Sequence, residues 1–141
     1  EDLRTAAEWL WHADALVVCS GTALEAGSGE QSLEQAWLAF RKLELSYAEL
    51  CDPQRFREDP RLAWGFWLHR LQASRAAPPP PGYGAARSLL NRMPKGGFLF
   101  TSGVEGAWVV AGWPGERVVE MNGTLGLLQC AESCSWDIGP L

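Results

Sequence analysis

The 141-residue sequence lacks any long apolar run: no stretch approaches the roughly 20 residues that a helix needs to cross a bilayer. It also lacks a run of charge, because 12 basic and 17 acidic residues are spread thinly and the net charge is -5. No basic patch is therefore present that would bind nucleic acid. The N-terminus shows no signal pattern of charged and then apolar residues. We expect a soluble domain whose partners include neither DNA nor RNA and which has no transmembrane segment.

The chain begins at Glu1 and has no initial methionine. This predicts a processed chain or the ordered part of a longer one. If a targeting peptide has been removed, the mature domain would reside in an organelle. The sequence does not identify the compartment.

Histidine is scarce, with two residues in the chain. His12 and His69 lie on predicted helices without a cysteine or carboxylate at ligand spacing, which favours packing or surface roles. With 47% hydrophobic residues, the chain can build a core without disulfide bonds. We therefore expect free thiols. The four cysteines are Cys19, Cys51, Cys130 and Cys134.

Tryptophan, in contrast, is abundant, with eight residues. Tryptophan is enriched in cores and at protein interfaces. Trp37, Trp64 and Trp67 follow helical periodicity and are predicted to be core residues. The later tryptophans are Trp108, Trp113 and Trp136, and we expect at least one of them to contact a partner.

Three short apolar runs indicate the fold class. Ala15–Cys19, Phe98–Thr101 and Arg117–Glu120 are rich in β-branched or aromatic residues, which is typical of strands covered on both faces. Helical patterns separate them. This alternation predicts an α/β fold, a partial doubly wound (Rossmann-like) parallel sheet of about three strands flanked by helices.

The helices are predicted from periodicity and capping signals. An opening helix from Leu3 should end near Ala13, and Ser32 with Gln35 forms a capping box for a second helix. Ser46 with Glu49 repeats this pattern for a brief helix. Further helices are expected from Asp59-Pro60 to about Ser74, over Ala86 to Met93, and within Val104 to Gly112. We expect a single domain over residues 1–141, with an exposed proline-rich loop at 76–84.

Several motifs together resemble the sirtuins, the NAD-dependent protein deacylases. Ser20-Gly21-Thr22-Ala23, followed by Ser28-Gly29, resembles the family's opening strand and glycine turn. Phe98 to Ser102 aligns with the strand that ends in TQN or TSN. Glu116 to Glu120, with Asn122-Gly123 and then Leu128 to Cys130, matches the run through the catalytic HG to the first zinc cysteine. The resemblance extends over nearly the whole chain and implies a truncated sirtuin-like domain.

The departures from the family pattern fall on its functional residues. Ala23 replaces a glycine of the phosphate turn, and Glu34 stands where the family has an arginine. Gly103 and Glu105 replace the asparagine and aspartate that position ribose and nicotinamide. The catalytic histidine falls at Asn122, whose amide cannot act as a general base. These degenerate positions predict that the chain has no catalytic residues.

The resemblance also defines what could remain of the cofactor site. NAD is the cofactor that the family implies, although the departures lead us to expect none. If NAD binding is retained, its contacts would be Gly21, Thr22, Ser28, Gly29, Thr101 and Ser102. Cys130 and Cys134 resemble the first cysteine pair of the family's zinc module, but no second pair follows. We therefore expect no bound metal.

Three functions remain open at this point. The first is a catalytically inactive structural or interaction subunit, bound to other protein chains in a multi-subunit assembly. The second is a regulatory domain that binds NAD or ADP-ribose without turning it over, against which Glu34 counts. The third is a residual NAD-dependent deacylase in which Glu105 has taken over the role of base.

Overall fold

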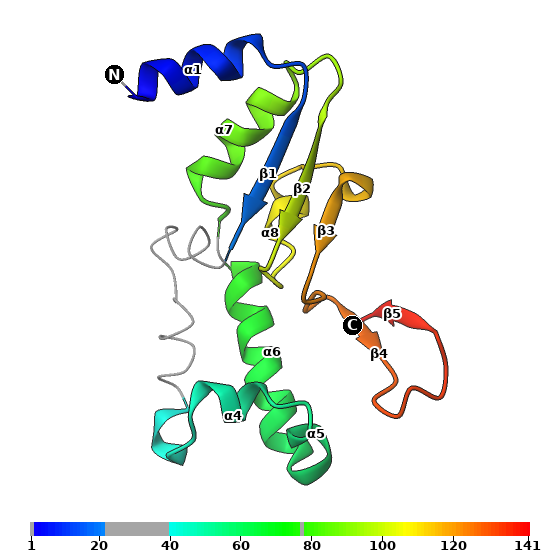
Figure 1. The fold of residues 1–141 in the computed structure, drawn as a ribbon. Coiled ribbons are helices and arrows are strands. Elements are labelled where there is room, and N and C mark those ends of the chain that lie inside the picture. Colours follow the sequence, from blue (N-terminus) through cyan, green and yellow to red (C-terminus); the bar gives the residue numbers. More distant parts are fainter. Residues whose placement is uncertain (1, 22–39, 77) are drawn as a thin grey trace.

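The computed structural model of the chain describes residues 2–21, 40–76 and 78–141. Its centre is a parallel sheet of β1 (Leu16–Ser20), β2 (Gly97–Thr101) and β3 (Val118–Glu120), with β2 in the middle (Figure 1). Leu16 is paired with Gly97, and Leu99 is paired with Val118. The prediction of three adjacent parallel strands is confirmed, with ends that differ by one residue at most.

One face of the sheet carries the core. Helices α7 (Pro81–Leu90) and α8 (Ala107–Val110) cover this face. The buried cluster lies between them and the sheet and consists of Tyr83, Leu90, Leu99, Trp108 and Trp113. The ring centroids of Tyr83 and Trp108 are 4.1 Å apart, so aromatic packing holds α8 against α7.

Within residues 2–21, 40–76 and 78–141, little covers the opposite face of the sheet. Side chains alternate along a strand, so the residues that point away from the core are Val17, Cys19, Phe98, Phe100 and Val119. We refer to these five residues as the open face. Val17 is 65% exposed, Phe100 41% and Val119 39%. These exposures differ from the cover on both faces that the apolar run Ala15–Cys19 indicates.

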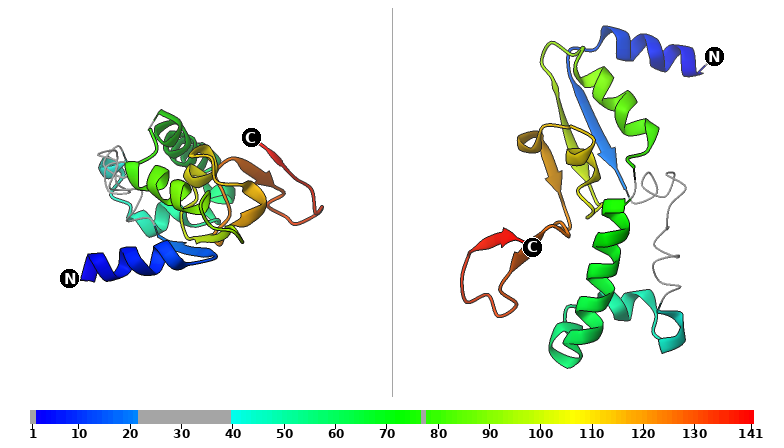
Figure 2. Two further views of the ribbon diagram at one scale, coloured as in Figure 1. Left: turned by 90° about the horizontal axis from the view of Figure 1, so that it is seen from above. Right: turned by 180° about the vertical axis from the view of Figure 1, so that it is seen from behind.

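A helical module projects below the sheet (Figures 1 and 2). It consists of a 3-10 turn η1 (Arg41–Leu43) and the helices α4 (Tyr47–Cys51), α5 (Arg55–Glu58) and α6 (Pro60–Ala76). The predicted capping box of α4 is confirmed. The Ser46 hydroxyl accepts from the Glu49 N–H at 3.2 Å, and the Ser46 N–H donates to Glu49 Oε2 at 2.7 Å.

The buried side of α6 differs from the predicted one. Trp64, predicted to be a core residue, is 39% exposed, and Leu68 beside it is 37% exposed. The buried residues of α6 are Ala63, Phe66, Arg70 and Leu71. The Phe66 ring packs edge-on against the Phe40, Tyr47 and Trp67 rings at 5.3 to 6.0 Å between centroids. This aromatic cluster lies on the buried side of α6.

The proline-rich connection is shorter than predicted. Helix α6 extends to Ala76 and α7 begins at Pro81, so the expected loop at 76–84 is wrong at both ends. The fixed φ of proline suits the first position of a helix, where the missing N–H has no intrahelical partner. Pro81 therefore begins a helix instead of excluding one.

The two ends of the described chain extend from this body. Helix α1 (Asp2–His12) matches the predicted opening helix, and none of its residues is buried. At the other end, β4 (Leu127–Gln129) and β5 (Ile138–Pro140) form an antiparallel pair that the sequence did not predict. None of the helices in the part that the structure describes has the length and apolar character to cross a membrane. The predicted helix that begins at Ser32 lies outside the described residues.

Candidate functional site

The carboxyl ends of the three parallel strands meet at one edge of the sheet. Gly21 follows β1, Ser102 follows β2 and Asn122 lies just beyond β3. The Ser102 N–H donates to the Ser20 carbonyl at 3.1 Å, and the Asn122 side-chain amide donates to the Ser102 carbonyl at 3.1 Å. A Cβ at Gly21 would lie 3.5 Å from Ser102 Oγ. Open α/β sheets bind their ligands at this edge, so we take it as the candidate site.

Asn122 occupies the position that the resemblance assigns to the catalytic histidine. Its side chain is exposed, and its Nδ2 donates to backbone. An amide nitrogen has no basic lone pair, and the Nδ2 proton is directed at the Ser102 carbonyl. The residue can thus hold the β2 and β3 ends together, but it cannot accept a proton from a substrate hydroxyl.

The candidate nucleotide contacts are distributed unevenly. Thr101 is only 3% exposed, and its hydroxyl accepts from the Gly103 N–H at 3.0 Å, so it faces the interior. Gly21 and the half-buried Ser102 remain at the edge. Thr22, Ser28 and Gly29 lie outside the described residues, as do the departures at Ala23 and Glu34.

Glu105, proposed above as a substitute base, is tied into an ion pair with Arg70 of α6. Its other carboxylate oxygen accepts from the Val104 N–H at 2.9 Å. The two side chains are nearly buried, with 5% of Arg70 and 16% of Glu105 exposed. A carboxylate held this way has its oxygens occupied, so Glu105 holds α6 against the loop after β2.

Arg70 continues this network into the helical module. Its guanidinium donates to the Tyr47 hydroxyl at 2.7 Å and lies 5.4 Å from the centroid of the Trp67 ring. Burial is the main cause that raises the pKa of Tyr47 to about 12. Sequence reasoning missed Arg70. The signal was present, because Arg70 follows Ala63 and Phe66 at helical spacing and so lies on the same side of α6.

Glu120 is a second carboxyl group at this edge, and its pKa is raised. Partial burial raises its pKa above the usual range, the negative charge of Glu105 adds to the rise, and a hydrogen bond with Thr124 opposes it. Because the folded state holds the proton more tightly than the unfolded chain, ionisation of Glu120 destabilises the fold. The contribution of Glu120 to the free energy of unfolding therefore falls as the pH rises, first through the pKa of Glu120 in the unfolded chain and then through its pKa in the folded chain.

We expect Glu120→Gln to be more stable than the native chain at neutral pH and similar to it at low pH, where Glu120 is protonated. Urea unfolding at several pH values checks this. The difference between variant and native chain should grow as the pH rises. Glu116→Gln, at an exposed position on the preceding turn, is the control and should show no comparable trend. A Glu120→Gln difference that is constant with pH would contradict the assignment.

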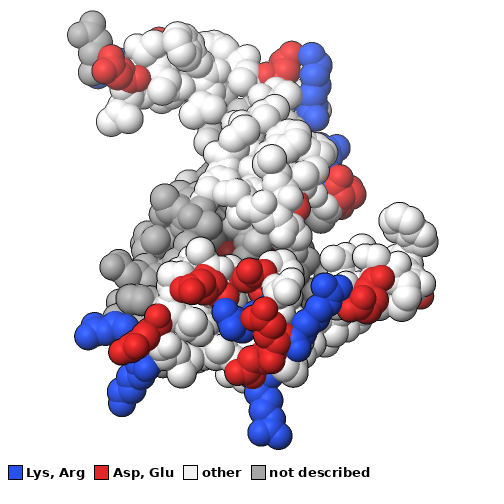
Figure 3. Space-filling model, turned by 60° about the horizontal axis from the view of Figure 1, so that its bottom comes forward, with Lys and Arg blue, Asp and Glu red and all other residues white. Residues whose placement is uncertain are grey.

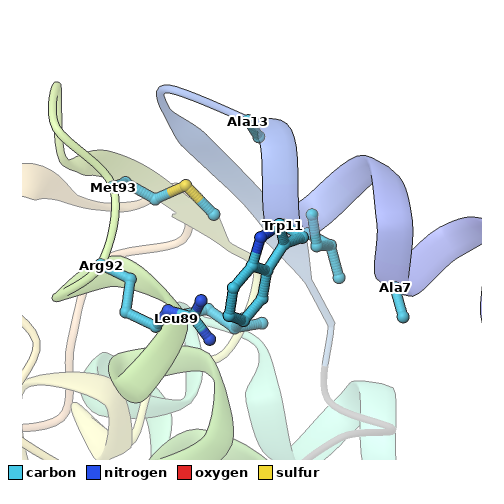
Figure 4. Close-up of a pocket in the computed structure, with 7 residues that line it drawn as sticks. Ala7, Trp11, Ala13, Leu89, Arg92 and Met93 are labelled. Atoms are coloured by element: carbon cyan, nitrogen blue, oxygen red, sulfur yellow. The ribbon is translucent and has the colours of Figure 1, made fainter.

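The described chain also contains a cavity of about 260 Å³ between α1 and α7, at the opposite edge of the sheet (Figure 4). Trp11, Leu89, Arg92 and Met93 line it, and the Arg92 guanidinium stacks on the Trp11 ring at 3.8 Å. The cavity is remote from the carboxyl ends of the strands, and Arg92 is the one titratable residue among those that line it. It therefore adds no chemistry to the candidate site.

Cys130 and Cys134 are the described residues that would form the first ligand pair of the zinc module that the family resemblance implies. Cys130 and Cys134 place their sulfurs 2.9 Å apart. Two thiolates on one tetrahedral zinc would be roughly 3.7 Å apart, given Zn–S bonds of about 2.3 Å. Structural zinc takes four ligands, and the described residues contain no group of three or more His, Cys, Asp or Glu that could hold a metal.

The fold and this strand-end edge define a Rossmann-like α/β domain. No protein-family model matches the chain. A NAD-dependent protein deacylase of Deinococcus radiodurans is 31% identical over 99% of this chain, and NAD-dependent protein deacylase 2 of Pseudomonas aeruginosa is 29% identical over the same share. The chain spans about half the length of these curated relatives, 56% and 55%.

Solved structures agree with this. A Sir2 homologue in complex with NAD superposes with a TM-score of 0.79 at 22% identity, over 98% of this chain and 51% of that one. A Sir2 homologue with a histidine-to-asparagine mutation, in complex with ADP ribose, gives 0.76 at 22% identity, over 97% and 52%. The chain belongs to the sirtuin family.

Proposed function

We propose that this chain is a sirtuin-family domain without deacylase chemistry of its own, which serves as a structural or interaction subunit of a larger protein assembly. The absence of deacylase chemistry is inferred from two residues that follow the strands β3 and β2, Asn122 and Glu105. Asn122 is an amide hydrogen-bonded to backbone, and the Glu105 carboxylate is engaged by Arg70. Neither position that could supply the base is free to do so, and base catalysis contributes about 10²–10⁴-fold to a rate.

The open face supports the proposed role as a structural or interaction subunit. Parallel sheets are normally covered by helices on both faces, whereas the described helices of this chain cover the side that carries α7 and α8. Contiguous exposed apolar surface marks interaction sites. On the face shown in Figure 3, charged side chains gather at the end that carries α4 to α6, and the part between this end and α1 is mostly uncharged. The partner that such a sheet surface accepts is an apolar helical one.

We expect the isolated chain to self-associate through the open face when no partner is present. The double variant Val17→Thr with Phe100→Thr keeps β-forming side chains but removes apolar area. It should weaken association by more than about tenfold, because burying each large apolar side chain is worth about 1.5–3 kcal/mol. Sedimentation over a range of concentrations measures this.

The matched control is Val110→Thr, a 73% exposed position on α8 that lies off the open face. It should leave association unchanged. If the unmodified chain is monomeric at every concentration, the interaction role loses its main support.

A second candidate is a domain that binds NAD or ADP-ribose without turnover. Two observations favour it. One structural neighbour carries a histidine-to-asparagine mutation and is in complex with ADP ribose. In this chain, Gly21 lies beside Ser102 at the carboxyl ends of the strands. Titration calorimetry with ADP-ribose separates the two candidates, because a micromolar dissociation constant supports binding. Gly21→Ala should then weaken binding without unfolding the chain, since the added Cβ makes an ordinary contact 3.5 Å from Ser102 Oγ.

The third function, a residual deacylase with Glu105 as base, is disfavoured by the Arg70 ion pair. To act as a base, Glu105 would have to leave a nearly buried cation unpaired. Breaking a buried pair in this way costs about 3–5 kcal/mol.

A further inference from the structure

The cavity between α1 and α7 has the size of a site for a small molecule. Its volume is about 260 Å³ (Figure 4). Trp11 reaches it from α1, whereas Leu89, Arg92 and Met93 reach it from α7 and the turn that follows. Ligand pockets usually measure about 300–1,000 Å³, so a cavity at the small end of this range fits a compact ligand better than a segment of a partner chain.

The two walls of this cavity are held in place by contacts between the end of α1 and the turn after α7. The Lys95 N–H donates to the Asp14 carbonyl at 2.8 Å, and Lys95 Nζ forms an ion pair with Asp14 Oδ2 at 3.0 Å. The Arg92 guanidinium lies 3.8 Å from the centroid of the Trp11 ring. Met93 is 7% exposed and anchors its wall in the domain. The cavity is therefore formed without a ligand.

The polar groups of the cavity differ from its walls in one respect, since they are hydrogen-bond donors. Arg92 supplies a guanidinium and Trp11 an indole N–H, and neither group can accept. The other lining residues are alanine, leucine and methionine, so the lining contains no carboxylate. The ion pairs among the described residues all involve side chains other than Arg92. A cation beside apolar walls, without a counter-charge from the lining, suits a ligand that carries one negative charge on an apolar body.

We propose that this cavity binds a small aromatic monocarboxylate. The carboxylate would accept hydrogen bonds from the Arg92 guanidinium, whose planar arrangement of donors matches the two carboxylate oxygens. The aromatic ring would lie against Leu89 and Met93, because a thioether makes favourable contacts with aromatic rings. A phosphate or a dicarboxylate fits less well, since one cation cannot balance a second charge that apolar walls have desolvated.

Binding at this position would connect α1 to the body of the domain. None of the residues of α1 is buried, so a ligand held between Trp11 and Met93 would add contacts that this helix otherwise has few of. The cavity lies at the opposite edge of the sheet from Gly21 and Asn122. The inference is therefore independent of the proposed function, and either can fail without the other.

The test titrates the full chain, isotope-labelled at the tryptophan indole nitrogens, with phenylacetate and follows the indole signals by NMR. Trp11→Phe identifies the Trp11 signal. The result expected is a saturable shift of this signal with a dissociation constant below about 1 mM. The Trp9 signal should stay unchanged, because Trp9 is 75% exposed and residues two apart on a helix do not share a face. Phenylacetamide, a neutral analogue of similar shape, should bind at least about tenfold more weakly.

Variants of the arginine separate charge from shape. Arg92→Gln should weaken phenylacetate binding by more than about tenfold, whereas Arg92→Lys keeps the positive charge and should weaken it less. Arg61→Gln, at an exposed position on α6, is the matched control and should bind as the native chain does. Circular dichroism checks that each variant is folded. If Arg92→Gln does not fold, the comparison of phenylacetate with phenylacetamide on the native chain still decides.

Three results would overturn the proposal. The first is a Trp11 signal that does not move at phenylacetate concentrations up to about 10 mM. The second is equal affinity for phenylacetate and phenylacetamide, which would mean that apolar contact alone accounts for binding. The third is a peptide with a C-terminal phenylalanine carboxylate that binds more tightly than phenylacetate, because the cavity would then recognise a protein partner instead of a small molecule.

Discussion

Replacing Arg70 by methionine is expected to lower the free energy of unfolding by about 3–5 kcal/mol, the cost of leaving one member of a buried ion pair without its partner. Methionine keeps much of the apolar stem of the side chain, but it is shorter than arginine and carries no charge. The variant leaves the Glu105 carboxylate at 16% exposure without its cation, and it also removes the hydrogen bond to Tyr47. Urea unfolding followed by tryptophan fluorescence measures the loss.

Two controls separate this effect from a general loss of charge. The double variant Arg70→Met with Glu105→Gln removes both charges and should recover most of the stability, because no unpaired ion remains. Lys95→Met breaks an exposed pair, in which the Lys95 and Asp14 side chains are 72% and 62% exposed, and it should cost less than about 1 kcal/mol. Equal losses in Arg70→Met and Lys95→Met would show that the buried network is not special.

Restoring histidine at Asn122 is expected to leave deacylation undetectable. A base at this position is normally worth about 10²–10⁴-fold, so a chain that lacked only the base would gain activity on this scale. Here the neighbouring positions are also changed, since Gly103 has no side chain and Glu105 is held by Arg70. Nicotinamide release from NAD with an acetyl-lysine peptide is the readout.

Asn122→Gln serves as the matched variant, because it alters the contact with the Ser102 carbonyl without adding a base. A rise in turnover of about a hundredfold in Asn122→His over Asn122→Gln would mean that the base was the only missing group. That result would contradict the proposal that several positions fail together.

The sheet could be predicted closely from the sequence. Ala15–Cys19, Phe98–Thr101 and Arg117–Glu120 are short segments rich in β-branched or aromatic residues, which favour strands, and the end of each observed strand differs from the prediction by one residue at most. The capping box at Ser46 was equally reliable. These are local signals, determined by a few neighbouring residues, so tertiary context changes them little.

The orientation of α6 could not be predicted in the same way. Periodicity selected Trp64 and Leu68 for the core, but the buried positions include a charged residue, Arg70. Helical spacing places Arg70 on the same side of α6 as Ala63 and Phe66, but a count of apolar residues does not select this side, because Glu105, the partner of Arg70, is distant in the sequence. The ion pair becomes visible only when α6 and the end of β2 are placed together.

The β4 and β5 pair was missed for a related reason. Its strands are three residues each and mostly exposed, so they show no apolar run and no clear alternation. The late tryptophans illustrate the same difficulty. Trp108 and Trp113 are 3% and 2% exposed and pack inside the domain, whereas Trp136 is fully exposed. The expectation of a partner contact therefore rests on Trp136 and stays a prediction.

The measurement that tests the central claim most directly is nicotinamide release by the unmodified chain, purified and folded, from NAD with an acetyl-lysine peptide. The Asn122 side chain is an amide and cannot act as a base, and the Glu105 carboxylate forms an ion pair with Arg70. We therefore predict no release above the rate without protein, at any pH between 6 and 9 (about the range in which a base would act). Release that consumes NAD and acetyl-peptide in equal amounts, and that disappears when the chain is unfolded, would contradict the account.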